Sequence, residues 1–277
     1  MGKSSVYKLF FTIIIWLPLL FDIVPSFLFA RGAAITNSEV GVPEAASSRN
    51  RTNPEISVIN INNMAYWVNK DGSHPVINRQ AIYPIFTGGL IYNDGMVWGV
   101  KANEYPESAP VRVGGSTYYT GMKAGRVIYN QDGTVAGADD PENNHTWRVR
   151  RDYVTGDLSV DVANFYGTSV DDITGAQIQA VFDQYAYDWN NWPATWGAPY
   201  DDVDGNGSYD PNVDIPGYPG ADQTLWTISN DLPTIVDENG NPTGVVSNTS
   251  PQVYGSEPVG VELRLTMWAY KLESDKP

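Results

Sequence analysis

The chain of 277 residues contains no cysteine and only two histidines, His74 and His145. The absence of cysteine excludes disulfide bonds, thiol nucleophiles, zinc–thiolate sites and iron–sulfur clusters. Two histidines are too few for a three-histidine zinc site within one chain. His74 precedes Pro75 and His145 lies in the polar run 143–146, so we expect both to be surface residues.

Basic residues are also scarce, and they are unevenly distributed. The formal net charge is −15, which disfavours nucleic-acid binding because that affinity depends on Lys and Arg neutralising phosphates. No Lys or Arg lies between Asp152 and Glu262, a stretch that holds 18 acidic side chains. These carboxylates are solvated, or bind cations, or pair with the preceding Arg148, Arg150 and Arg151.

Common catalytic motifs are missing as well. The chain has no Gly-x-Ser-x-Gly elbow, no phosphate-binding Gly-Lys-Ser/Thr loop and no His-Glu-x-x-His motif. Glycoside hydrolysis needs only two carboxylates, but 32 acidic residues give no basis for choosing a pair. We therefore favour a protein without catalytic activity and keep a carbohydrate-active protein as the alternative.

The N-terminus has the pattern of an export signal. Lys3 and Lys8 precede an apolar stretch, Leu9–Phe21, which is shorter than the ~20 residues needed to span a bilayer. Small residues begin at Ala30, where cleavage would release a secreted or cell-surface protein. The alternative is an uncleaved anchor that continues through Phe29. No later segment is apolar enough to cross a membrane, so we expect no transmembrane segment in the mature chain.

Three segments follow from this pattern and from composition. Residues 1–30 are the expected signal peptide, residues 31–55 a flexible leader, and residues 56–277 a single β-rich domain. The chain is 42% hydrophobic and 12% aromatic, which is enough to bury a core.

The expected fold is mainly β, an antiparallel sheet or sandwich, with an inserted helical hairpin near 157–190. Short β-type stretches alternate with Gly, Asn and Asp turns. The predicted strands include 64–68, 147–153 and 259–267. The predicted hairpin turns are 93–95, 114–115 and 130–133.

The clearest predicted helix covers 174–189. Thr174 and Gln177 have the spacing of a capping box, and an apolar stripe follows at helical period. A shorter helix, 158–166, precedes it and ends at Gly167. We interpret the stripe as a packing face.

The segment 199–217 carries oxygen-bearing side chains at the spacing of a calcium loop. Calcium takes ~6–8 oxygen ligands, and a glycine lets the backbone turn around the ion. The predicted ligands are Asp202, Asp204, Asn206, Ser208 through its carbonyl, Asp210 and, near the position of the usual bidentate Glu, Asp214. Pro211 and Pro216 disfavour a helix after the loop, so it is no EF-hand. The alternative is a plain turn that binds no ion.

Three tryptophans, Trp189, Trp192 and Trp196, lie just before this segment. Exposed tryptophan rings can stack on sugars, so a glycan-binding protein that uses Trp192 and Trp196 is a second hypothesis. We favour the other interpretation, in which these rings cover the end of the helix and seal the loop against the core.

Six short motifs occur in a recognisable order. They are 60–68, 94–99, 197–200, 214–217, 220–226 and 260–270. Together they resemble the N-terminal region of large secreted bacterial proteins of unknown function, many of which look like cargo of the type IX secretion route and carry a C-terminal sorting domain. The resemblance implies a truncated form of a longer protein and implies no activity.

These observations predict a secreted or cell-surface structural or binding module with a Ca²⁺-stabilised loop. Its expected partner is an extracellular glycan or another surface protein, and not a nucleic acid.

Overall fold

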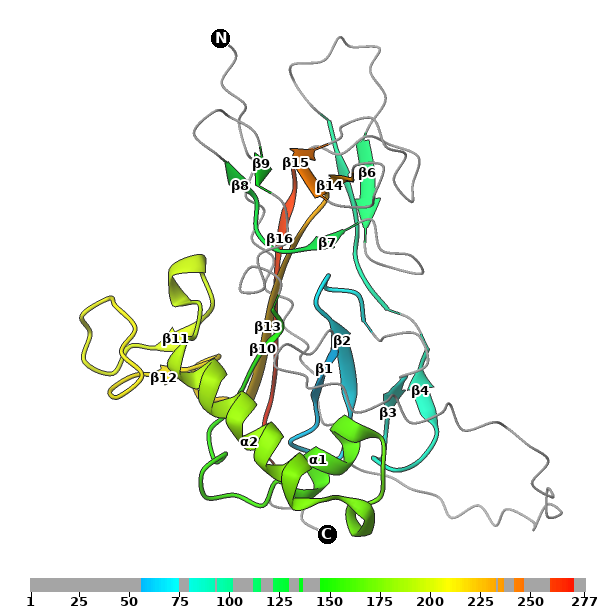
Figure 1. The fold of residues 1–277 in the computed structure, drawn as a ribbon, viewed down its shortest axis with the longest axis vertical. Helices are drawn as coiled ribbons and strands as arrows, with labels where there is room; N and C mark the ends of the chain where they lie inside the picture. Colours follow the sequence, from blue (N-terminus) through cyan, green and yellow to red (C-terminus); the bar gives the residue numbers. More distant parts are fainter. Residues whose placement is uncertain are drawn as a thin grey trace, which may run out of the picture. The chain divides into compact units, whose positions relative to one another are not determined.

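The structure is a computed structural model of the chain. It describes residues 56–74, 80–92, 94–101, 112–115, 122–129, 135–136, 145–232, 234–236, 242–246 and 260–271. The predicted signal peptide 1–30 and leader 31–55 lie outside the described residues. What is described is mainly β, with antiparallel pairing and a helical hairpin, as predicted (Figure 1). Of the helices in these ranges, none combines the length and apolar character that crossing a membrane requires.

The described ranges contain short strands, two α-helices and two 3₁₀ turns. The strands are β1 (Ile56–Ile59), β2 (Tyr66–Asn69), β3 (Ala81–Ile82), β4 (Gly89–Ile91), β5 (Val97–Val100), β6 (Arg112–Gly115), β7 (Lys123–Ala124), β8 (Ile128–Tyr129), β9 (Val135–Ala136), β10 (Trp147–Arg150), β11 (Tyr200–Asp201), β12 (Ile215–Pro216), β13 (Gln223–Asn230), β14 (Thr234–Val236), β15 (Pro242–Val246) and β16 (Glu262–Ala269). The α-helices are α1 (Ser159–Tyr166) and α2 (Gly175–Asn190). The 3₁₀ turns are η1 (Val170–Asp172) and η2 (Ala194–Trp196).

Strand β13 is the centre of the main sheet, and all eight of its residues are buried. It pairs antiparallel with β16 along its whole length. On its other edge it pairs first with β10 and then with β7 (Figure 1). The other described strand pairs are two-stranded ladders, among them β1–β2 and β11–β12.

The two faces of β13 belong to different cores, because successive side chains of a strand point to opposite sides. Leu225 packs with residues of β1, β2 and β16. Trp226 and Ile228 pack on the other side, with Trp147 and Trp192. The sheet is therefore covered on one face by the β1–β2 ladder and on the other by the segment that follows α2.

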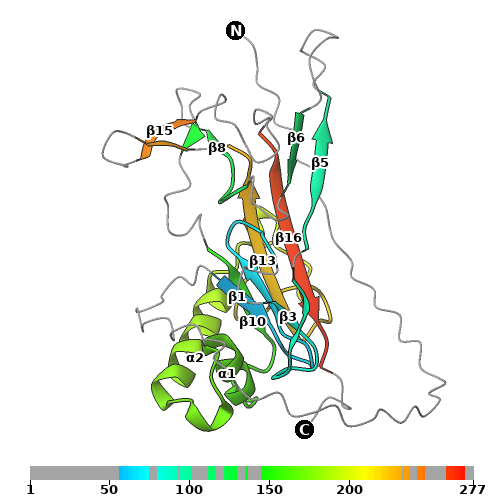
Figure 2. The same ribbon diagram turned by 90° about the vertical axis from the view of Figure 1, so that its right-hand side faces the viewer.

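The predicted helical hairpin is confirmed, and its ends have the predicted causes. The Thr174 hydroxyl accepts a hydrogen bond from Gln177 N, while the Gln177 side chain accepts one from Thr174 N, so the capping box is complete. Helix α1 ends at Gly167, whose φ of 68° is left-handed and favours glycine. The pair lies beside β1 and β10 (Figure 2).

A buried polar network joins this hairpin to the sheet. Arg148 on β10 is 3% exposed; its guanidinium donates to the Asp161 carboxylate of α1 and to the Tyr185 hydroxyl of α2. The Tyr185 hydroxyl donates to Asp161 Oδ2 at 2.5 Å and accepts from Gln223 Nε2 on β13 at 2.9 Å. Asn60, just after β1, donates to Asp161 Oδ1 at 3.0 Å. One carboxylate and one hydroxyl therefore hold five segments together.

The charges in this network are matched. Burial raises the pKa of the Tyr185 hydroxyl, so it remains a neutral donor to Asp161. A second arginine, Arg150, forms an ion pair with Asp152 at 2.5 Å. Of the three alternatives for the acidic stretch, pairing with the preceding arginines is therefore correct for Asp152 and Asp161.

Two of the predicted hairpins are wrong. The residues on either side of 93–95 do not pair with each other, because β4 pairs with β3 and β5 pairs with β6. Gly114 and Gly115 lie inside β6 rather than in a turn. A Cβ on Gly114 would lie 2.2 Å from Trp98 Cζ2, so this glycine makes room for a ring on the neighbouring strand. The third hairpin is confirmed as the β8–β9 pair.

We predict that Arg148→Met lowers the free energy of unfolding by about 3–5 kcal/mol, because it leaves the Asp161 charge buried without its cation. Urea denaturation measures this loss. The matched control is Lys271→Met, which removes an exposed partner of Asp152 and costs less than about 1 kcal/mol. Adding Asp161→Asn to Arg148→Met removes the uncompensated charge and recovers part of the loss. Equal effects of the two single variants would contradict the network's role.

We predict that Thr174→Ala destabilises the protein by about 1 kcal/mol, because the Gln177 backbone N–H loses its acceptor. The comparison is Thr174→Ser, which keeps the hydroxyl and retains most of the stability. Thermal or urea unfolding distinguishes them, and identical midpoints for Ala and Ser would show that the cap contributes nothing.

Candidate metal centre

The acidic run folds into a loop, residues 202–214, that is closed at its base. Strands β11 and β12 pair there, with Tyr200 opposite Pro216 and Asp201 opposite Ile215. The next residue, Gly217, has a φ of 100°, and a Cβ there would lie 2.6 Å from Thr224 Oγ1. Only glycine fits this approach to β13, so the end of the loop is fixed against the main sheet.

Aromatic residues fix the loop to the end of α2. The Trp189 indole N–H donates to Pro211 O at 3.1 Å, and the Tyr209 hydroxyl donates to Trp189 O. The Tyr209 ring also packs edge-on against Tyr200, with centroids 5.5 Å apart. The loop is therefore held at its base and along one side.

Asp214 joins the two arms of the loop. Its side chain is buried, with 2% of the residue exposed. Asp214 Oδ1 accepts from Val203 N at 2.9 Å, and Oδ2 accepts from Asp210 N at 2.8 Å. A buried carboxylate needs such donors, since an isolated charge out of water is costly.

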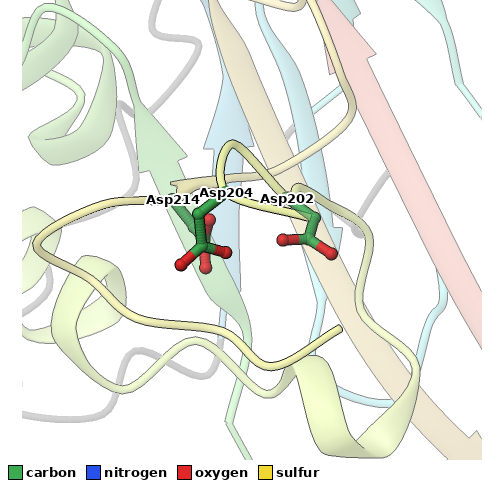
Figure 3. Close-up of side chains that lie close together, drawn as sticks. All are labelled: Asp202, Asp204 and Asp214. Carbon is green, nitrogen blue, oxygen red and sulfur yellow. The ribbon is translucent and has the colours of Figure 1, made fainter. Parts of the chain in front are cut away.

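Asp202, Asp204 and Asp214 converge in this loop (Figure 3). Each offers a carboxylate oxygen, and these oxygens lie within 4.8 Å of one another. Asp214 is buried, Asp202 is half-buried and Asp204 is exposed. The three side chains form an acidic triad that could hold a metal ion.

Backbone N–H groups orient the two carboxylates of the first arm. Asp202 Oδ1 accepts from Asn206 N at 3.1 Å and Oδ2 accepts from Gly207 N at 2.8 Å. Asp204 Oδ1 also accepts from Asn206 N, at 3.1 Å. The loop itself contains no Lys or Arg, so these carboxylates are placed by neutral donors.

The local potential is negative, and two tyrosines respond to it. Partial burial, together with the charges on Asp214 and Asp210, raises the pKa of the Tyr209 hydroxyl. Desolvation and the charges on Asp202, Asp214 and Asp204 raise the pKa of the Tyr200 hydroxyl. Both hydroxyls stay protonated at neutral pH, and a cation bound in the loop would offset the same potential.

The other predicted ligands have different positions. Asn206 borders the triad, since its Nδ2 donates to Asp204 Oδ2 at 2.7 Å. Ser208 is exposed, and its backbone N–H donates to Asn206 Oδ1 at 2.7 Å. The carboxylate of Asp210 is outside the triad, and its Oδ1 accepts two hydrogen bonds from Asn212, both at 2.9 Å. The contact of Trp189 with the loop agrees with the expectation that the tryptophans seal the loop against the core, whereas the hydrogen bond from the Tyr209 hydroxyl was not predicted.

The tryptophans pack on the core, as expected. Trp192 is 4% exposed, and its indole N–H donates to Pro199 O at 2.8 Å. Trp189 and Trp196 are partly buried in the same cluster. The Arg126 guanidinium lies 4.2 Å from the centroid of the Trp196 ring. Trp192 therefore presents no open face to a sugar.

The expectation that both histidines are surface residues is wrong. His145 is 4% exposed, and its Nε2 lies 2.6 Å from Asp188 Oδ1 on α2. Burial raises the pKa of Asp188, and His145 acts against that shift. His74 is 7% exposed, with its Nδ1 2.7 Å from Gly72 O. Polar neighbours in sequence do not reveal burial when the burial depends on distant segments, such as α2 for His145.

Comparison of the whole chain with protein-family models, curated proteins and solved structures finds no match. The resemblance to secreted bacterial proteins therefore stays a prediction, and the loop itself is the main source of information on function.

We predict that Asp214→Asn accelerates hydrogen exchange at the Val203 and Asp210 amides, because an amide group cannot accept at both of its terminal atoms. Asp204→Asn is the control, since it removes one charge from the same loop without touching either amide. Unchanged exchange in Asp214→Asn would show that the buried carboxylate does not hold the two arms.

Proposed function

We propose that this chain is a secreted or cell-surface structural or binding module, without catalytic activity, whose loop 202–214 binds Ca²⁺ as a structural clip. The observation that supports the cation is the acidic triad Asp202, Asp204 and Asp214, whose oxygens lie within 4.8 Å of one another. The export pattern at the N-terminus supports the location.

Calcium suits the donors that this loop offers. The triad supplies only carboxylate oxygens, which are the ligands of hard cations, whereas zinc prefers nitrogen and sulfur. Asn206 and the carbonyl of Ser208 lie close enough in sequence to complete a set of oxygens, together with Asp210 or water. Extracellular calcium sites function with Kd values as weak as ~10⁻⁴–10⁻³ M, so an incomplete set of protein ligands is sufficient.

A structural role follows from where the loop is attached. Its base is the β11–β12 ladder, its side contacts the end of α2, and its buried Asp214 links both arms. An ion shared by Asp202 and Asp204 on one arm and Asp214 on the other would add a second link between the two arms of the loop. It would also neutralise three carboxylates that otherwise repel one another.

The module's partner belongs to the proposal as well. An extracellular glycan or another surface protein fits the proposed location. Because Trp192 is buried, a glycan cannot stack on Trp192 and Trp196 as a pair, and its binding surface would lie elsewhere.

The decisive experiment is thermal unfolding in millimolar calcium and in chelator. A calcium concentration about ten times Kd stabilises the folded state by about 1.4 kcal/mol, provided that the unfolded chain does not bind. For a domain of this size we expect the midpoint to rise by roughly 3–6 °C. Equilibrium dialysis with metal analysis counts the bound ions.

The matched variants are Asp204→Asn, which alters the exposed member of the triad, and Asp171→Asn, which removes an equal charge from the exposed turn η1. We expect Asp204→Asn to lose most of the calcium response and Asp171→Asn to keep it. Identical midpoints with and without calcium in the unaltered chain would overturn the proposal.

A further inference from the structure

The loop carries an asparagine followed by glycine at an exposed position. Asn206 and Gly207 are both exposed, and Gly207 has a φ of 76° with open space around its Cα. In an Asn-Gly pair no side chain shields the glycine nitrogen, so that nitrogen can approach the asparagine side-chain carbonyl. Cyclisation to a succinimide is the reaction that this approach allows.

Three hydrogen bonds arrange the reacting atoms. Ser208 N donates to Asn206 Oδ1 at 2.7 Å, which folds the side-chain carbonyl alongside the Asn206–Gly207 peptide. Gly207 N donates to Asp202 Oδ2 at 2.8 Å. Asn206 Nδ2 donates to Asp204 Oδ2 at 2.7 Å. Each reacting group of the cyclisation therefore has one polar contact: the attacking nitrogen of Gly207, the side-chain carbonyl of Asn206 and its departing amide nitrogen.

We infer that Asn206 is a self-modification site, at which the fold promotes deamidation. Gly207 N attacks Asn206 Cγ and passes its proton to the Asp202 carboxylate, which acts as general base. The negative charge that develops on Oδ1 is stabilised by the Ser208 N–H. The Cγ–Nδ2 bond then breaks, and the amide nitrogen takes up one proton and leaves as ammonia. Water opens the succinimide to aspartate or isoaspartate, so asparagine and water give the acid and ammonia.

The product changes the loop in one of two ways. Aspartate adds a carboxylate beside Asp202 and Asp204, whereas isoaspartate inserts a methylene group into the main chain. This inference goes beyond the proposed function and does not require a bound cation.

The test is a time course of the full chain at neutral pH in chelator, read by peptide mass spectrometry. Trypsin has no site between Arg151 and Arg264, so chymotrypsin is used; cleavage after Tyr200 and Tyr209 releases the peptide 201–209. Conversion of Asn206 appears as replacement of the amide by an acid. The same Asn206–Gly207 pair in the urea-unfolded chain is the reference for the dipeptide alone.

We expect Asn206 to react faster in the folded protein than in the urea-unfolded chain, where the three contacts are lost. Asp202→Asn should slow the reaction about tenfold, below the ~10²–10⁴ that a positioned acid or base contributes in enzymes. The control Asp171→Asn removes the same charge from the exposed turn η1, outside the loop, and its rate should match the unaltered chain. Equal rates in the folded and unfolded protein, or an unchanged rate in Asp202→Asn, would overturn the inference.

A calcium arm separates this inference from the proposed function. If calcium occupies Asp202 and Asp204, it removes the base and slows deamidation. Rapid deamidation in chelator with no effect of calcium would support the inference and count against the calcium proposal. A melting temperature that rises with calcium, with no faster reaction at Asn206 in the folded chain, would support the calcium proposal and count against the inference.

Discussion

The pairing of Arg148 with Asp161 is the interaction on which the rest of the described structure depends. Two opposite charges are buried together, and such a pair is tolerated only when further hydrogen bonds satisfy both groups. The Tyr185 hydroxyl bonds both groups and Asn60 donates to Asp161, while Gln223 donates in turn to the Tyr185 hydroxyl. Because these residues come from two helices and three strands or their ends, the position of the helical hairpin on the sheet follows from one electrostatic requirement.

The candidate metal centre depends on that position indirectly. Tyr185 and Trp189 are one helical turn apart on α2, so the helix that carries the network also carries the anchor of the loop. Trp189 meets the loop through its indole N–H and through its carbonyl. The acidic triad thus lies beside the end of a helix whose position is set by the core, and hydrogen bonds within the loop orient its carboxylates.

What could be predicted from the sequence was mostly local. Thr174, Gln177 and the apolar stripe lie within one helix, so the helix was predicted correctly, and regular spacing was enough to bring Asp202, Asp204 and Asp214 into one candidate site. The central strand β13 was missed. It carries polar residues on both faces, Gln223 and Thr227 on one and Thr224 on the other, so it shows no simple alternation.

Long-range contacts explain both that omission and the errors. Gln223 accepts from Asn60 N, and the Thr227 hydroxyl donates to Lys70 O, so their burial is satisfied by segments far away in the chain. The turn signals at 93–95 and 114–115 failed for the same reason. The Asn-Asp-Gly and Gly-Gly patterns report what the backbone tolerates locally, whereas the strand partner and the Trp98 ring that needs Gly114 come from elsewhere.

The separation between Asn60 and Gln223, 163 residues, has a consequence for the path by which this chain reaches its structure. Contacts of such high contact order form only after the loop between them has closed, and chains dominated by them fold on a timescale of roughly milliseconds to seconds. During synthesis, the β1 segment has to wait for β13 to emerge before its polar groups meet their partners. In a nascent chain, the contact between the β1 segment and β13 is therefore absent until synthesis has passed β13.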